Sequence, residues 1–193
     1  MPSAKSARSG IMTATRGSRR APKLEAGLAP AAFLSYVRKD DVNDDGRISH
    51  FRGLLSKALD LQAGRPFQVF QDRDDIAWGE AWQQRIDGAI DGTSFLIPVI
   101  TPAYFKSVPC RRELRRFLRR EKKRRRKDLI FPLYYVSCPE LDDRAVTARN
   151  ALAKAIARHN YTDWRELRLA SKGALRKPID GLARDLVKAL RRR

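Results

Sequence analysis

The sequence has few of the residues that build disulfide scaffolds or metal sites. Its 193 residues include only two cysteines, Cys110 and Cys138, and two histidines, His50 and His159. So few cysteines exclude a disulfide scaffold, and no CxxC or HxxxH spacing is present for structural zinc. No stretch approaches the ~18 consecutive apolar residues of a membrane span, and residues 1–30 lack the apolar core of a signal peptide. We therefore expect a cytoplasmic chain with no transmembrane segment.

Motifs of common nucleotide and hydrolase sites are also missing. The chain contains no GxGxxG, no GxxxxGK[ST] and no GxSxG. Residues 41–46 (DVNDDG) match the opening of a calcium loop, with oxygen ligands at positions one, three and five and glycine at six. Position twelve is Arg52, where calcium needs a bidentate glutamate. We interpret this segment as a polar turn before a helix, and we expect no metal site.

Positive charge is what the chain has in excess, with a formal net charge of +19. Residues 1–30 are rich in Ser, Ala, Gly and Arg and show no periodic apolar face, which predicts a disordered basic tail before a single domain, 31–193. Residues 111–127 hold twelve cations and two acids. Such a run is usually a solvated face, but its density also predicts weak contact with nucleic acid or an anionic surface.

The rest of the chain alternates apolar runs with helical patterns. Runs typical of buried strands are found at 31–37, 67–70, 95–100 and 129–136, with a weaker extended piece at 161–164. Helical spacing is found at 48–61, at 78–90, in a basic helix with Thr101 as its N-cap, at 144–158 and from about Pro178 onward. This order predicts an α/β, flavodoxin-like three-layer α/β/α fold with a central, mostly parallel five-stranded sheet. A ligand crevice would lie beyond the carboxyl ends of the strands.

Four segments, in this order, resemble the Toll/interleukin receptor (TIR) domain family. Residues 33–41 (FLSYVRKDD) resemble the first family box, and residues 69–82 (VFQDRDDIAWGEAW) are similar to the second strand and its loop. Residues 97–114 (IPVITPAYFKSVPCRREL) are similar to the strand and helix that carry S-x-x-C-x-x-E-L. Residues 161–168 (YTDWRELR) resemble a late segment common in bacterial members. The match spans about residues 31–190 and predicts a TIR domain of bacterial type.

The resemblance implies a chemistry for one glutamate. Many TIR domains hydrolyse NAD⁺ at the nicotinamide–ribose bond, and their essential glutamate maps to Glu113. NAD⁺ would then be a substrate, and no cofactor is expected. Nicotinamide leaves as a neutral ring, so a single carboxylate facing an oxocarbenium-like ribose suffices. From spacing alone, Glu113 would instead be a solvated helix residue paired with Arg116, three positions later.

The resemblance also implies binding residues after the first strand. Ser35, Tyr36 and Arg38 would line the pocket for nicotinamide and ribose. Arg38 could bind an NAD⁺ phosphate bidentately. The alternative for Arg38 is a surface ion pair with Asp40 or Asp41.

Further pocket candidates each have a structural alternative. Trp78 could stack on nicotinamide or adenine, or it could be a core anchor that shares a helical face with Trp82. Ser107 is a pocket residue or the N-cap of its helix. Cys110 is a pocket residue or a small buried side chain, and no histidine near it in sequence marks it as a nucleophile.

The resemblance therefore implies a TIR-domain NAD⁺ glycohydrolase, that is, an NAD⁺ nucleosidase that could also cyclise its product, in signalling or defence. The resemblance implies activation by TIR–TIR self-association, in which the loop at 72–79 contacts a neighbouring TIR domain. One alternative is a non-catalytic TIR adaptor for protein–protein signalling. Another is a basic nucleic-acid-binding protein built on the same fold.

Overall fold

The computed structural model describes residues 31–71 and 94–192. The predicted disordered tail, Trp78 and Trp82 lie outside the described residues, as does the helix expected at 78–90. Among the described residues, no helix combines the length and the apolar character needed to cross a bilayer.

The described residues form a five-stranded sheet in the order β2-β1-β3-β4-β5, with every pair parallel. The strands are β1 (Ala31–Ser35), β2 (Gln68–Gln71), β3 (Phe95–Ile100), β4 (Leu133–Tyr134) and β5 (Thr162–Asp163). This order confirms the flavodoxin-like prediction, and it places a topological switch point between β1 and β3. All residues of β1 and β3 are buried, as expected for apolar runs at the centre of a parallel sheet.

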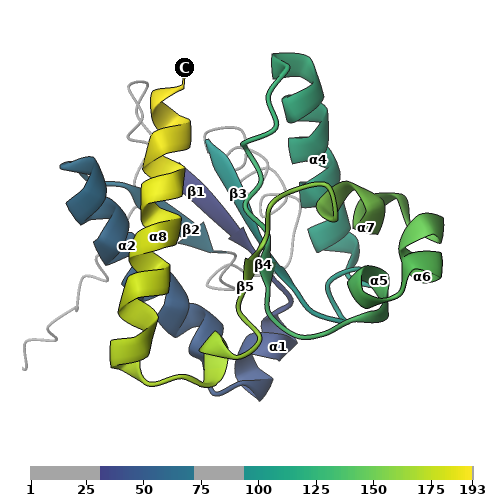
Figure 1. The fold of residues 1–193 in the computed structure, drawn as a ribbon, viewed down its shortest axis with the longest axis horizontal. Coiled ribbons are helices and arrows are strands. Elements are labelled where there is room, and N and C mark those ends of the chain that lie inside the picture. Colours follow the sequence, from purple (N-terminus) through teal and green to yellow (C-terminus); the bar gives the residue numbers. More distant parts are fainter. Residues whose placement is uncertain (1–30, 72–93, 193) are drawn as a thin grey trace, which may run out of the picture.

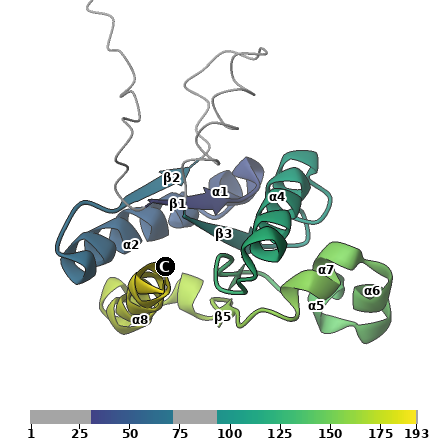
Figure 2. The same cartoon turned by 90° about the horizontal axis from the view of Figure 1, so that it is seen from above.

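Helices cover both faces of the sheet (Figures 1 and 2). They are α1 (Arg38–Asn43), α2 (Arg47–Ala63), α4 (Val108–Arg124), α5 (Pro139–Asp142), α6 (Arg144–Arg149), α7 (Ala151–Ile156) and α8 (Lys172–Arg191), with a 3₁₀ turn, η1, at Leu167–Leu169. Figure 2 shows α2 and α8 side by side on one face and α4 on the other, next to α7. The core is one continuous cluster, in which Trp164 packs edge-on against Phe51 with ring centroids 4.9 Å apart.

The strand predicted at 129–136 is much shorter in the structure. Only Leu133–Tyr134 pairs as a strand, together with one isolated bridge from Leu96 to Ile130. The amide of Leu96 donates to the Leu129 carbonyl, so the backbone N–H and C=O groups of the even-numbered residues of β3 are directed toward β4. Pro98 lies on that side and has no N–H to donate, so the ladder toward β4 is interrupted.

Two predicted helices have different boundaries. The single helix expected at 144–158 is broken at Asn150, whose extended backbone lets its side chain accept hydrogen bonds from the amides of the next helix. The last helix begins at Lys172 rather than near Pro178. Pro178 therefore lies inside α8, where it removes a backbone donor. The helix continues through it because Leu175 and Ile179 both bury against the core.

The polar turn expected at 41–46 is partly helical. Its first three residues complete α1, and only the last three form a turn before α2. The Asp41 carboxylate accepts hydrogen bonds from the amide and hydroxyl of Ser49, at 3.0 and 2.6 Å. Asp44 pairs with Arg168 at 2.8 Å. These carboxylates therefore serve the fold, by linking α1 to α2 and to the η1 turn.

Candidate functional site

The candidate site lies at the switch point, where β1 and β3 end next to each other. Ser35 is the last residue of β1, and the chain leaves β3 through a turn that contains Thr101 and Tyr104. Helix α4 begins at Val108, just after that turn, and carries Glu113 on its inner side. Segments far apart in the sequence thus meet at one edge of the sheet (Figure 1).

Glu113 is directed into the protein rather than into solvent. Its side chain is only 3% exposed, and its Oε2 accepts a hydrogen bond of 2.6 Å from the Ser35 hydroxyl. The solvated placement expected from spacing alone is therefore wrong. A short bond from a hydroxyl to a carboxylate is among the stronger hydrogen bonds in proteins. It orients the carboxylate at the end of β1, next to the predicted pocket residues.

Tyr104 extends this contact and was not among the predicted site residues. Its phenol oxygen lies 3.2 Å from Ser35 Oγ, and its side chain is fully buried. Burial, together with the nearby Cys110 and Glu113, holds the pKa of Tyr104 well above its usual value, although the hydrogen bond with Ser35 lowers it. The phenol therefore keeps its proton. In the sequence, the signal for this residue is its place as a polar side chain soon after the apolar run 95–100.

The beginning of α4 differs in part from the prediction. Thr101 is not its N-cap; the hydroxyl of Thr101 accepts from the Tyr104 amide in the turn and donates to Asp40 Oδ2 at 2.6 Å. Ser107 is the N-cap, and its hydroxyl accepts from the Cys110 amide at 3.4 Å. The structural alternative for Ser107 is thereby confirmed, since the capping bond satisfies one of the open amides of the first turn.

Cys110 lies beside Glu113 on the inner face of α4. It is buried, which raises the pKa of its thiol to about 12; the nearby Glu113 adds to this rise, and the hydrogen bond with Ser107 opposes it. A thiol with that pKa is protonated at neutral pH and is a poor nucleophile. The buried alternative for Cys110 is confirmed.

The remaining predicted residues lie at the rim. Tyr36 is half-buried just after β1, and Arg38 is exposed at the start of α1. The carboxylates of Asp40 and Asp41 accept hydrogen bonds from Thr101 and Ser49. Trp78 cannot be placed relative to them, because it lies outside the described residues.

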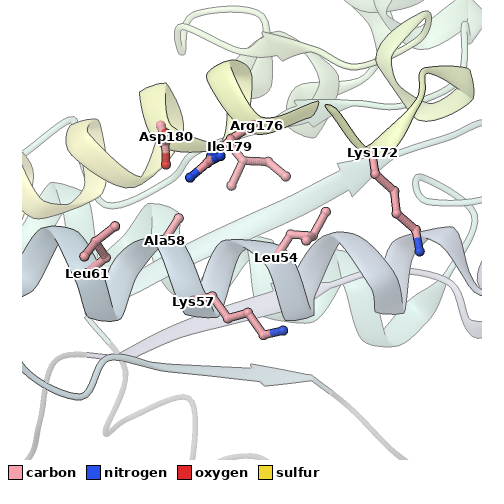
Figure 3. A pocket seen from close by; sticks show the side chains of 8 residues that line it. All are labelled: Leu54, Lys57, Ala58, Leu61, Lys172, Arg176, Ile179 and Asp180. Carbon is pink, nitrogen blue, oxygen red and sulfur yellow. The ribbon is translucent and has the colours of Figure 1, made fainter. Parts of the chain in front are cut away.

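A groove of about 330 Å³ lies elsewhere, between α2 and α8 (Figure 3). Leu54, Ala58 and Leu61 of α2 and Ile179 of α8 form its apolar part. Charged residues of both helices complete the lining: Lys57, Lys172, Arg176 and Asp180. Glu113 does not line this groove, which is on the face of the sheet opposite α4.

Among the described residues, no group of three or more histidine, cysteine, aspartate or glutamate side chains is placed to hold a metal ion. Among the described residues, Glu113, Ser35, Tyr104 and Cys110 bring a carboxylate, two hydroxyls and a protonated thiol together at the switch point. Such a set can accept hydrogen bonds from sugar hydroxyls and can face a developing positive charge.

Comparison with known proteins agrees with the motifs. The family model described as "TIR domain" matches residues 33–176. Among solved structures, the chain is similar to the TIR domains in the structure of the activated Roq1 resistosome directly recognizing the pathogen effector XopQ. The two share 19% identity over 80% of this chain and 84% of that chain, with a TM-score of 0.43. No curated protein matches. Since the family match spans the strands and helices that build the switch point, the chain belongs to the TIR domain family.

Proposed function

We propose that this TIR domain is an NAD⁺ glycohydrolase that cleaves the bond between nicotinamide and ribose. The observation that carries the proposal is the buried carboxylate of Glu113, which the Ser35 hydroxyl orients at the switch point of the sheet. In a doubly wound sheet this is where ligands bind. A solvated glutamate on the outer side of α4 would be too far from this edge of the sheet to contact a ligand bound there.

The chemistry follows from the charge of NAD⁺. The nicotinamide ring is a cationic pyridinium, so it leaves as a neutral molecule and needs no general acid. The electron pair of the glycosidic bond goes to the ring nitrogen, and positive charge develops on the ribose. In this proposal the Glu113 carboxylate accepts hydrogen bonds from ribose hydroxyls and stabilises that charge. Water then attacks the anomeric carbon, which gives ADP-ribose and releases one proton to the solvent.

The other residues bind the substrate in this scheme. Ser35 and Tyr36 line the nicotinamide–ribose end, and the exposed Arg38 binds a phosphate. Ser107 and Cys110 shape the wall formed by α4, and Trp78 stacks on a ring. We propose further that self-association with other TIR domains activates the chain, and that it acts in the cytoplasm, in signalling or defence.

The test is release of nicotinamide from NAD⁺, measured by chromatography over a range of protein concentrations, with and without a crowding agent. Glu113→Gln keeps the shape and an acceptor oxygen but removes the charge. We expect nicotinamide release to fall by about 100-fold or more. Specific activity of the wild type should rise with protein concentration, and the product peak separates linear from cyclic ADP-ribose.

The matched control is Glu121→Gln. Glu121 is a second buried glutamate on α4, two turns further along, and it contacts His159 rather than the switch point. Glu121→Gln should keep its turnover once circular dichroism shows that it is folded. Equal turnover by Glu113→Gln and the wild type would exclude the site. No turnover by any variant, even when assembled, would favour the alternative function, a non-catalytic TIR adaptor.

A further inference from the structure

The hydrogen bonds of Ser35 determine whether the Tyr104 phenol donates or accepts at the switch point. Ser35 has one hydroxyl proton, and the short bond of 2.6 Å to Glu113 Oε2 uses it. Ser35 Oγ also has the phenol oxygen of Tyr104 at 3.2 Å and a hydrogen bond with the Cys110 thiol. Since Ser35 has no second proton to give, the phenol must donate and Ser35 must accept.

We propose that Tyr104 is a positioning residue for Glu113, acting through Ser35 in the directed chain Tyr104 Oη–H to Ser35 Oγ–H to Glu113 Oε2. The inference rests on the proposed function, because it gives that carboxylate its orientation. It also predicts a property of the folded protein that can be measured without substrate.

Burial explains why this series of hydrogen bonds runs in one direction, from Tyr104 to Glu113. Tyr104 and Ser35 are each at most 1% exposed, so water does not compete for their hydroxyls. The strongly raised pKa of Tyr104 keeps the phenol protonated over the whole working range of pH. A donor that never ionises holds the Ser35 hydroxyl pointed at the carboxylate, and hydrogen bonds in series strengthen one another.

Other groups near Glu113 act differently. The Cys110 thiol lies on the same helix and is protonated at neutral pH. Elsewhere on α4, Arg112 is exposed and Arg116 is half-buried. The Cys110 thiol, a weaker donor, also hydrogen-bonds Ser35, whereas the phenol lies 3.2 Å from the oxygen that bonds Glu113. Removing the phenol hydroxyl while keeping the thiol therefore tests the role of Tyr104.

The experiment uses Tyr104→Phe, which keeps the ring and its packing but removes the donor. Its matched control is Tyr134→Phe, which removes another buried phenol that donates to a carboxylate, that of Asp142 at 2.6 Å, away from the switch point. The first measurement is the pH titration of the Glu113 side-chain carboxyl ¹³C resonance in each variant. The second is the kinetics of NAD⁺ cleavage.

We expect the midpoint of the Glu113 titration to rise by about half a pH unit in Tyr104→Phe and to stay unchanged in Tyr134→Phe. We expect kcat to fall about three- to tenfold in Tyr104→Phe, with KM within about twofold of wild type. An unchanged midpoint in Tyr104→Phe overturns the inference, whether or not kcat changes, because the phenol would then be merely structural.

The two proposals fail in different ways. If the wild type releases no nicotinamide but the midpoint shifts as expected, the proposed function fails and the positioning chain stands. If Glu113→Gln abolishes cleavage but Tyr104→Phe leaves both the midpoint and kcat unchanged, the function stands and the positioning inference fails.

Discussion

The carboxylate of Glu113, on α4, is shielded from water and accepts a hydrogen bond from the Ser35 hydroxyl at the end of β1. Removing that hydroxyl takes a donor away from a buried carboxylate, which costs more than losing the same bond where water can reach it. A second serine–carboxylate bond in the protein has the same length: Ser49 donates to Asp41 at 2.6 Å, but there the side chain of Ser49 is only half-buried. The two bonds therefore differ in access to water rather than in geometry.

Ser35→Ala should lower the free energy of unfolding by about 2 kcal/mol, and Ser49→Ala by about 1 kcal/mol. The physical reason is that water can replace the lost hydroxyl at Asp41 but not at Glu113. Urea unfolding followed by circular dichroism measures both. A smaller loss for Ser35→Ala than for Ser49→Ala would show that Glu113 is hydrated in solution.

Sequence reasoning at the residue scale identified Glu113, Ser107 and Cys110 as candidates but could not decide between their alternatives. The S-x-x-C-x-x-E-L spacing placed all three early in a helix. Whether Glu113 faced water or the sheet depended on how that helix rotates against β3, which spacing does not contain. Tyr104 was missed because it becomes significant only through Ser35, which is 69 positions away.

Helix α4 is held at its far end by another buried carboxylate. Glu121 Oε1 accepts from the Leu129 amide at 3.0 Å, and its Oε2 lies 2.9 Å from His159 Nε2. The other ring nitrogen, His159 Nδ1, lies 2.9 Å from the carbonyl of Ala155. Both neighbours are acceptors, so both ring nitrogens donate and the imidazole is cationic. This contact joins α4 to the turn after α7.

The pKa of His159 sets how stability depends on pH. Burial alone lowers this pKa, but the hydrogen bonds to Glu121 and Ala155 and the charge of Glu121 together outweigh burial and raise it above its usual value. The folded state thus binds the proton more tightly than the unfolded state. The stabilisation is fully present below the unfolded-state pKa of about 6.5 and is lost as pH rises through the folded-state pKa.

We expect the free energy of unfolding to decrease as pH rises above about 6.5, and His159→Gln to remove that slope. Urea unfolding at a series of pH values measures the effect. His50→Gln is the control, because His50 is exposed on α2 and should leave the slope in place. A slope that survives in His159→Gln would assign it to another group.

Prediction at the element scale succeeded where one pattern dominated. Phe95–Ile100 was predicted with its observed bounds because a continuous apolar run suits a strand buried on both faces. It failed where two signals competed. The residues at 129–136 are apolar as a buried strand requires, but Pro98 of β3 has no N–H to hydrogen-bond them, so most of the run does not pair as a strand. Pro178 resembled the first residue of a helix, yet α8 begins six residues earlier, at Lys172, because burial of Leu175 stabilises the additional turns.

For the whole molecule, the basic run resolves into one charged face. Both of its acids, Glu113 and Glu121, lie on the buried side of α4 together with Leu114 and Phe117. The exposed side of the helix therefore presents cations with no acid among them; these are Arg112, Arg115, Arg119, Lys122, Lys123 and Arg124. The face that α4 turns to water is thus more basic than the sequence composition suggests.

We predict weak binding of duplex DNA through this face, with affinity that falls as salt rises. The variant Arg115→Glu/Arg119→Glu/Lys122→Glu should weaken binding by about tenfold or more at low salt. Fluorescence anisotropy between 50 and 200 mM salt, the range over which such contacts weaken, measures this.

The control for charge alone is Lys172→Glu/Arg176→Glu/Lys188→Glu, which makes the same change in net charge at exposed positions of α8. It should weaken DNA binding much less than the α4 variant. Equal losses in the two variants would mean that overall charge, and not this face, attracts the nucleic acid.

The sequence by itself determined the alternation of strands and helices, the central strand and the order of the TIR segments, because hydrophobic periodicity and local motifs act over a few neighbouring residues. Only the tertiary structure decided that Glu113 is buried, that Ser35 donates to it across 78 positions, and that Tyr104 lies behind Ser35. Those contacts depend on strand order and on the rotation of α4 against the sheet, which are settled by packing between distant segments.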